Sequence, residues 1–575
     1  MSDYEEKPIG AKDHHQVVSG PSTSGSVTPP LGDTTVSVND IDGSKAKHNY
    51  NVDTESLISD TTLIAQQEGL KPAFLAKANI LNNAIADIGM GRYQYELFFS
   101  GGFGWFADNI WLQAVAIVMQ SVSYEWEGYP NVRFATLALY AGLICGATFW
   151  GITADIIGRR IAWNSTLFIG GLFGICAGAA PNFIVFCTFV ALIGFGVGGN
   201  LPVDGTMFLE FMPGSHQWLL TLLSLWWAIG QVVASLISWA FIAKYGCVRD
   251  SENPPPTGAA WCTKADNSGW RYTYYTLGAM MLFLWALRIY ALPVYESPKF
   301  LASVGKDHEA VETIHKLAKR NGKTSTLTVE DLQNAAAPYM DDQDRANQAK
   351  YDTKFSVWEL IKNSMEDVSG DKLKTLFGTK RLAYSTSLII FCYGAVGLAY
   401  PLYNQFLTGY LSKKGAQLGS GSVNDTYSAY TYQAACGVPG SMAAAYLVTW
   451  SRAGRKFSMA FFTAGAGVFL FGLTAARNYP TINALTCIAA FMENAFYGVL
   501  FGYAPELFPT PVRGTGDALC ASFNRITGFF SPIIAIYSAA ATTPDGPVFA
   551  AAGIFVATGV IMCFLPVETY GRTAL

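Results

Sequence analysis

Three ionisable side chains interrupt long apolar runs of this sequence: Asp108, Glu493 and Arg525. A charge within a bilayer is costly to bury, and such residues usually mark the path of an ion or a substrate. With a rise of 1.5 Å per helical residue, each of the three falls roughly 20 Å from the end of its run, near the bilayer midplane. Asp204 is shallower, about 9 Å from Glu210. The deep charges are therefore our first candidates for chemistry.

Each of these charges allows two interpretations. Asp108 could carry a proton, because a carboxylate removed from water binds one readily. Alternatively, it is a fixed carboxylate that is hydrogen-bonded to Asn109, Gln113 or a neighbouring helix. Arg525 could clamp an anion through two parallel hydrogen bonds. It could equally neutralise Glu493 on the preceding helix, and we favour that pairing.

Uncharged polar side chains occur at similar depths. Any of them could hydrogen-bond a hydroxylated molecule, although bonding between neighbouring helices is the more common role for each one alone. Together with Asp204, Glu493 and Arg525, the predicted binding candidates are Asn200, Gln231, Tyr393, Asn404, Gln405, Asn494 and Asn524. Trp105, Trp226 and Trp227 could stack on the face of a sugar, but tryptophans also anchor helices at membrane interfaces.

The composition is that of a membrane protein. Hydrophobic residues make up 51% of the 575 residues and charged residues only 14%, too few to cover a soluble surface of this size. The net charge of -4 gives no reason to expect nucleic acid. No metal-ligand spacing, cofactor motif or catalytic constellation is found, so we expect no enzyme, no metal and no cofactor. The glycine run 194–199 matches a dinucleotide pattern but lies inside an apolar run, where small residues serve helix packing.

Apolar runs of membrane-spanning length divide the chain into two halves. The first 92 residues are polar and predict a disordered tail with a short amphipathic segment. Residues 93–298 and 381–567 each predict a six-helix bundle, joined by a linker, 299–380, with amphipathic helices, and followed by a short C-terminus, 568–575. The twelve predicted spans lie near 95–119, 134–154, 162–180, 183–208, 218–243, 271–293, 382–409, 428–449, 458–476, 481–505, 516–540 and 547–566.

Three charged cassettes recur in the same order in both halves, which indicates a duplicated membrane unit. Carboxylates and guanidinium groups at helix ends can pair and bond exposed carbonyl groups, so we predict an inner gate. Its residues are Gly151, Asp155, Gly158, Arg159, Arg160, Glu210, Glu296, Arg455, Glu506, Arg513 and Glu568. Alternatively, these loops are cationic only because cationic loops remain in the cytoplasm. The loop after Glu210 (Ser215, His216 and Gln217) offers no arginine partner.

Lysines and arginines gather in the loops after the second, sixth and eighth spans, which places these loops and both termini in the cytoplasm. We expect a multi-pass protein of the plasma membrane without a cleavable signal peptide. Cys247 and Cys262 then share an outer loop in an oxidising compartment, where they could form a disulfide or stay as two free thiols.

The cassette Gly151-x-x-x-Asp155-x-x-Gly158-Arg159-Arg160 resembles the signature loop of the major facilitator superfamily. Glu296-Ser-Pro-Lys299 and Glu568-Thr-Tyr-Gly-Arg572 are similar to the endings of its sugar-porter branch. The segment 194–213 is closer to the synaptic-vesicle-protein-related branch, of fungal type. The resemblance covers about residues 75–572. It implies an all-α major facilitator fold of twelve transmembrane helices in two pseudo-symmetric six-helix bundles.

The resemblance implies secondary active transport of a small organic solute, sugar-like or an organic acid, by alternating access. Asp108 resembles the first-helix aspartate that carries the proton in sugar/proton symporters. That family's arginine partner on the fourth helix would fall at Val190. We expect proton-coupled uptake by a monomer, with the solute, protons and the lipid bilayer as partners. The alternatives are a facilitative uniporter and a non-transporting nutrient receptor of the same fold.

Overall fold

The protein was analysed as a computed structural model. It describes residues 72–126, 132–216, 218–247, 262–292, 294–340, 376–405, 423–450, 453–508, 510–538 and 545–569, together with 38–39, 407 and 410–411. The chain divides into Met1–Thr34, which lies outside these residues, and a unit of Thr35–Leu575, to which all that follows refers. The predicted tail before residue 72 and the predicted C-terminal segment from residue 570 also lie largely outside the described residues.

The first bundle contains the helices between Arg92 and Tyr290. They are α3 (Arg92–Glu125), α4 (Phe134–Ile157), α5 (Arg159–Gly178), α6 (Phe183–Val197), α7 (Asn200–Glu210), α8 (Trp218–Leu222), α9 (Ser224–Tyr245) and α10 (Gly269–Tyr290). Two predicted spans are each divided in two here, as α6 with α7 and α8 with α9. The division between α6 and α7 falls at Gly198 and Gly199, and helical geometry resumes at Asn200.

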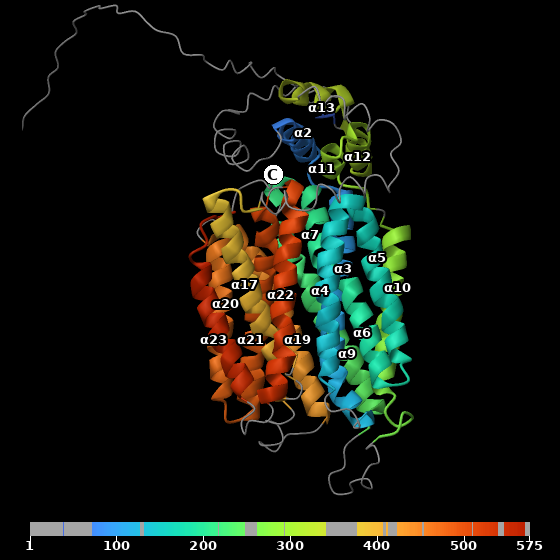
Figure 1. Cartoon of the computed structure of the whole chain (residues 1–575), viewed down its shortest axis with the longest axis vertical. Helices are drawn as coiled ribbons and strands as arrows, with labels where there is room; N and C mark the ends of the chain where they lie inside the picture. The colour runs from blue at the N-terminus through green and yellow to red at the C-terminus, as the bar shows by residue number, and fades with distance from the viewer. Residues whose placement is uncertain are drawn as a thin grey trace, which may run out of the picture. The chain divides into compact units, whose positions relative to one another are not determined.

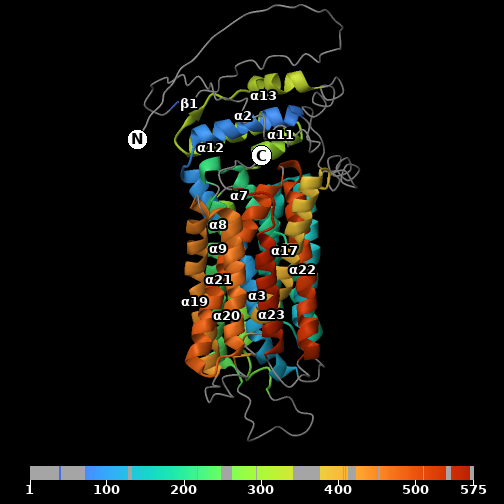
Figure 2. The same cartoon turned by 90° about the vertical axis from the view of Figure 1, so that its left-hand side faces the viewer.

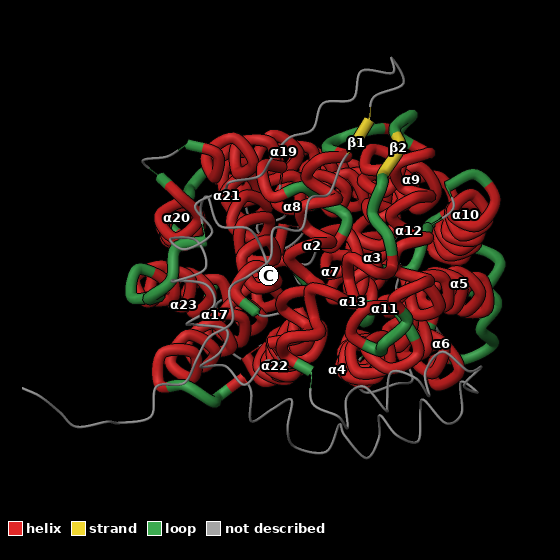
Figure 3. The backbone as a smooth tube through the Cα atoms, turned by 90° about the horizontal axis from the view of Figure 1, so that it is seen from above, coloured by secondary structure: helices red, strands yellow, loops and turns green. Residues whose placement is uncertain are grey.

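The second bundle contains the helices between Lys380 and Met562. They are α17 (Lys380–Asn404), α19 (Val423–Thr449), α20 (Gly454–Thr474), α21 (Tyr479–Leu507), α22 (Thr510–Ser538) and α23 (Gly546–Met562). The two bundles stand side by side with their helices roughly parallel, and Figure 3 views them end-on (Figure 1, Figure 3). With the divided helices counted once, the described residues contain twelve spans, so the predicted architecture of two six-helix bundles is confirmed.

By length and composition alone, 7 of the described helical stretches could cross a membrane. The other spans are α3, α10, α19 and α22, which carry more polar residues, and α23, which is shorter. Glycines let α4 and α6 approach closely, because a Cβ atom at Gly142 would overlap the Ala191 carbonyl and one at Gly194 would overlap the Leu139 carbonyl oxygen. The glycine run 194–199 therefore serves packing, as predicted.

Short helices gather beyond one end of the bundles, which we call the linker end (Figure 2). They are α2 (Pro72–Ile88), α11 (Pro298–Ser303), α12 (Asp307–Arg320) and α13 (Val329–Ala336), beside a two-residue pairing of β1 (Val38–Asn39) with β2 (Thr324–Ser325). Lys77 on α2 donates a 2.7 Å hydrogen bond to the Asp307 carboxylate, and both side chains are buried. The predicted tail 1–92 therefore contains an ordered helix that packs on the linker.

The opposite end, which we call the disulfide end, carries the bond between Cys247 and Cys262, whose Cα atoms lie 6.1 Å apart. The bond joins the residues that follow α9 to those that precede α10. Its two cysteines are 15 residues apart in the sequence.

We expect the Cys247→Ser/Cys262→Ser double variant to lose about 3 kcal/mol of unfolding free energy, because the unfolded chain regains the entropy of an open loop of that length. Thermal unfolding of purified protein in detergent measures the loss. Dithiothreitol should lower the midpoint of the wild type to that of the variant and leave the variant unchanged. An equal response of both proteins would contradict the prediction.

Candidate functional site

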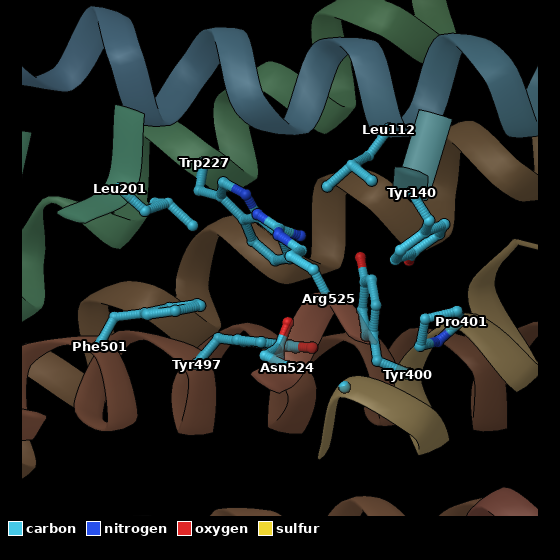
Figure 4. Close-up of a pocket in the computed structure, with 11 residues that line it drawn as sticks. Leu112, Tyr140, Leu201, Trp227, Tyr400, Pro401, Tyr497, Phe501, Asn524 and Arg525 are labelled. Carbon is cyan, nitrogen blue, oxygen red and sulfur yellow. The ribbon is translucent and has the colours of Figure 1, made fainter. Parts of the chain in front are cut away.

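A small cavity lies between the two bundles, near the middle of their length. Its volume is about 10 Å³, which is room for roughly one water molecule and not for an organic solute. The structure is therefore closed around this point. The lining consists of Leu112, Tyr140, Leu201, Trp227, Gly397, Tyr400, Pro401, Tyr497, Phe501, Asn524 and Arg525 (Figure 4).

An ion pair between Arg525 and Asp108 joins the bundles beside this cavity. The Nη2 atom of Arg525 lies 3.0 Å from Oδ1 and 3.2 Å from Oδ2 of Asp108. Trp227 donates a further 3.2 Å hydrogen bond from its indole Nε1 to Oδ2. The Asp108 side chain is 0% exposed and that of Arg525 is 7% exposed. Because α3 and α22 belong to different bundles, this pair connects the two halves of the molecule.

The favoured pairing of Arg525 with Glu493 is wrong. Glu493 Oε2 instead accepts a 2.6 Å hydrogen bond from Asn404 on α17, and Asn404 accepts a 3.2 Å bond from Gln433 on α19. Two helices that follow each other in the sequence need not direct their side chains toward each other. Glu493 points into its own bundle, whereas Arg525 points across to the other bundle. The alternative prediction for Asp108, a carboxylate held by a neighbouring helix, describes this closed state correctly.

Aromatic rings enclose the charged pair, and most of them were not predicted. Trp227 and Tyr497 have ring centroids 5.0 Å apart, Tyr497 and Tyr400 5.0 Å, and Tyr497 and Phe501 5.4 Å. Figure 4 shows these side chains grouped around Arg525. The sequence analysis named only Trp227 among them. A usable signal was present, since Tyr497 and Phe501 follow Glu493 at intervals of four and so share one face of α21.

Most of the uncharged candidates form bonds within the helical framework. Asn200 donates to the Gly104 carbonyl oxygen at 3.2 Å, and Asn524 donates to that of Tyr393 at 2.8 Å. Comparable bonds to main-chain oxygens are made by Tyr393 to Leu500, Gln405 to Leu112 and Asn494 to Ala490. Gln231 is buried on α9. Of the predicted binding residues, the cavity brings together Asn524 and Arg525.

Asp204 lies inside the first bundle and not in the cavity lining. Its Oδ2 atom faces Arg288 Nη2 at 3.4 Å, and both side chains are 0% exposed. Arg288 was not among the predicted residues, although it ends an apolar run. Gly104 makes room for this contact, because a Cβ atom there would collide with the Asp204 carboxylate.

At the linker end, a glutamate that follows the sixth span of each bundle binds the start of that bundle's third span. Glu296 accepts from the backbone N–H groups of Arg159 and Arg160 at 3.0 and 3.2 Å. Glu568 accepts from those of Arg455 and Lys456 at 3.0 and 3.1 Å. A carboxylate at a helix N-terminus satisfies unpaired N–H groups and the helix dipole. The recurrent cassettes thus form two equivalent caps.

A glycine lies at the start of each of these helices, Gly158 directly before α5 and Gly454 as the first residue of α20, and makes the cap possible. Gly158 has φ +96° and Gly454 has φ +63°, a region that other residues rarely adopt. A Cβ atom would lie 2.7 Å from Glu296 Oε2 at Gly158 and 2.8 Å from Glu568 Oε2 at Gly454. Each glycine is therefore needed for two reasons: its positive φ angle and the close approach of the glutamate carboxylate.

The arginine after each glycine pairs with a glutamate of its own bundle. Arg159 contacts Glu210, and Arg455 contacts Glu506, with all four side chains nearly buried. Glu210 therefore has an arginine partner that the sequence analysis did not foresee, from the second loop rather than the fourth. Arg160 is exposed, and the Asp155 side chain lies outside the described residues. Arg513 is buried and donates to the Phe508 carbonyl oxygen at 3.2 Å.

Small residues bring the bundles together at the linker end. A Cβ atom at Gly151 on α4 would collide with the Ala518 Cβ on α22. One helical turn deeper, the Thr148 and Ser522 hydroxyl groups lie 3.0 Å apart. The predicted gate residue Gly151 thus lies at a contact between bundles, whereas the Arg159 and Arg455 pairs lie within them.

Residues 93–574 match the family described as "Sugar (and other) transporter". The chain belongs to this family of the major facilitator superfamily. Among related proteins, the MFS siderochrome iron transporter 1 of Ceriporiopsis subvermispora is 41% identical over 92% of this chain and 98% of its own length. The synaptic vesicle 2-related protein of Xenopus laevis is 25% identical over 86% of this chain and 82% of its own. The transporter is thus a multi-pass membrane protein and not an enzyme.

The fold of this transporter is also that of a solved structure, the proton:xylose symporter XylE bound to 6-bromo-6-deoxy-D-glucose. The TM-score is 0.60 at 17% identity, with 84% of this chain and 98% of the other covered. At this identity the likeness concerns the arrangement of helices, not the solute.

Proposed function

We propose that this transporter moves a small organic solute together with protons by alternating access, with Asp108 as the proton-binding group. The observation that supports the proposal is the buried ion pair of Asp108 with Arg525 across the two bundles. XylE, which has the same fold, is a proton:xylose symporter, and this agrees with such coupling. Uptake into the cell is the proposed direction.

Protonation of Asp108 would change the contact between the bundles. A neutral carboxyl group no longer attracts the Arg525 guanidinium strongly, and the buried ion pair loses most of its Coulomb energy. The bundles can then separate on one side of the cavity. A proton bound from one compartment is released to the other only after the site has changed its exposure, and this ties the solute to the proton.

We also propose that the linker end faces the cytoplasm of a cell whose plasma membrane contains the protein. The basic loop residues Arg159, Arg160, Arg455 and Lys456 lie at this end, as cytoplasmic loops require. The disulfide then lies outside, where oxidised cysteines persist. On this view, the contact of Gly151 with Ala518 is the inner gate in its closed form.

Asp108→Asn tests the proposal in proteoliposomes that carry an imposed pH gradient. With a panel of sugars and carboxylates, we expect wild-type protein to accumulate at least one solute and the variant to accumulate none. The variant should still exchange labelled solute down its own gradient, which shows that it is folded. Glu312→Gln is the matched control, because Glu312 is a carboxylate on α12 whose side chain is 53% exposed.

Accumulation by Asp108→Asn at the wild-type level would contradict the assignment of the proton to Asp108. Wild-type transport that ignores the pH gradient would instead indicate a facilitative uniporter. Solute binding without any transport would favour the receptor.

A further inference from the structure

The cavity lining combines one cation with several aromatic rings. It presents a single cation, Arg525, whose carboxylate partner Asp108 is fully buried behind it. Five of the lining residues are aromatic: Tyr140, Trp227, Tyr400, Tyr497 and Phe501. Asn524 is the one amide in the lining, and its side-chain nitrogen already donates to a main-chain carbonyl.

We propose that the solute is an aromatic monocarboxylate, whose carboxylate takes the place of Asp108 on Arg525 when Asp108 is protonated. This inference rests on the proposed function of Asp108. The guanidinium has a planar, forked set of donors that suits a carboxylate. In the closed structure Nη2 of Arg525 contacts both oxygens of Asp108, so an incoming carboxylate would form a contact of the same kind.

The ring of the solute would occupy the aromatic surroundings. Rings whose centroids lie between 4.5 and 7 Å apart attract one another in tilted or offset arrangements. In the closed structure the rings of Trp227, Tyr400 and Tyr497 pack against one another, with centroids 5.0–5.7 Å apart. Separation of the bundles would expose the ring faces to the planar ring of a solute. An aromatic ring needs no hydrogen-bond partner in this lining, whereas each hydroxyl group of a polyol would need one, from the hydroxyl groups of Tyr140, Tyr400 and Tyr497 or from Asn524.

Charge balance in the cavity fixes the stoichiometry. In the closed structure, Arg525 and Asp108 sum to zero charge. With the proton on Asp108 and the anion on Arg525, the sum is again zero, and no charge is left unpaired in a low-dielectric site. One proton therefore enters with one monocarboxylate, and the loaded and empty carriers have the same net charge. The transport cycle is electroneutral.

Binding to the purified full-length protein tests the solute class without a transport assay. The probes are benzoate, benzamide, cyclohexanecarboxylate and xylose. Their binding is measured by titration calorimetry near neutral pH, in two buffers of different ionisation enthalpy so that proton uptake can be counted. We expect benzamide to bind at least about tenfold more weakly than benzoate, because it lacks the charge that pairs with Arg525. Cyclohexanecarboxylate should bind roughly tenfold more weakly than benzoate, because it lacks the ring faces. Each bound benzoate should draw one proton from the buffer.

Two variants locate the site. Arg525→Gln should weaken benzoate binding at least about tenfold, whereas Arg477→Gln, which removes an exposed arginine outside the cavity, should bind as wild type does. Asp108→Asn should bind benzoate without proton uptake. The inference is overturned if benzamide or xylose binds as well as benzoate, if wild-type binding draws no proton, or if Arg525→Gln keeps the wild-type affinity.

Electroneutrality has its own readout in proteoliposomes. Solute-driven proton entry, followed with an internal pH dye, should respond to a pH gradient and not to a potassium–valinomycin potential. Proton-driven accumulation of a neutral solute would overturn the proposal of an aromatic monocarboxylate. It would leave the assignment of the proton to Asp108 intact. The proposed function fails separately, if no solute of the panel moves with protons.

Discussion

Replacement of Arg288 by methionine is expected to lower the free energy of unfolding by about 3–5 kcal/mol, the cost of leaving one partner of a buried ion pair alone. Arg288 donates to the Trp163 carbonyl oxygen at 2.7 Å and to that of Ser100 at 2.5 Å, besides its contact with Asp204. Methionine keeps much of the volume but removes all three contacts. Asp204 would then be a buried carboxylate without its cation.

A double-mutant cycle separates the charge from the packing. Asp204→Asn alone leaves Arg288 its two carbonyl contacts, so a smaller loss is expected. The Arg288→Met/Asp204→Asn protein has no buried charge at this place and should be more stable than Arg288→Met alone. Unfolding in a mixed-detergent titration measures all four proteins. Losses that simply add would contradict a coupling between the two side chains.

The second expectation concerns pH and Lys299 on α11, at the linker end. Burial lowers the pKa of this lysine to about 7, and the nearby positive charges of Arg513 and Arg159 act in the same direction. The unfolded chain keeps the same proton up to a pKa of about 10.4. Between these values the unfolded state binds more protons, so the free energy of unfolding rises with pH. The cost of burying Lys299 is fully present below the folded pKa and disappears as pH rises toward the unfolded value.

Lys299→Met removes this dependence. Its stability advantage over wild type should be largest below pH ~7 and should shrink by about 1.4 kcal/mol per pH unit above it. Because all other titrating groups are shared, the difference between the two unfolding curves isolates this lysine. Lys306→Met is the matched control, since the Lys306 side chain is 34% exposed and pairs with Glu309 at the surface. A difference curve that is flat between pH ~7 and ~9.5 would contradict the lowered pKa.

The membrane architecture was predictable because it follows from the order and length of apolar runs. Twelve spans, the duplicated cassettes and the close glycine packing of α4 with α6 all follow from local composition. The breaks in α6–α7 and α8–α9 were not predicted, since each segment is long and apolar enough to be read as one continuous span. The order of α2 was also missed, because its partners on α12 and α13 lie more than 200 residues away.

The site was only partly predictable, because depth along a helix is local while facing direction depends on packing. Asp108 and Arg525 were both chosen for their depth along a helix, but Arg525 was assigned to Glu493 on the preceding helix and not to Asp108 on the other bundle. The arginines of Asp204 and Glu210 were missed for the same reason: Arg288 and Arg159 are 84 and 51 residues distant, and no local pattern connects them. In the sequence, Tyr400 and Tyr497 cannot be distinguished from aromatic residues of a helix core. Their place beside the cavity depends on how the two bundles pack together.

The glutamate caps have a consequence for how the halves can move. Glu296 and Glu568, which follow the sixth span of each bundle, bind the start of the third span of the same bundle. The ion pairs of Arg159 with Glu210 and of Arg455 with Glu506 also lie within one bundle each. Under the proposed alternating access, these caps and ion pairs move with their own bundle and so contribute equally to the inward- and outward-facing forms. Their loss is expected to lower the stability of the whole protein, whereas under the same proposal the ratio of the two forms depends on Asp108, Arg525 and the contact of Gly151 with Ala518. On this proposal, the stability of the protein and the balance between its two forms are set by different residues.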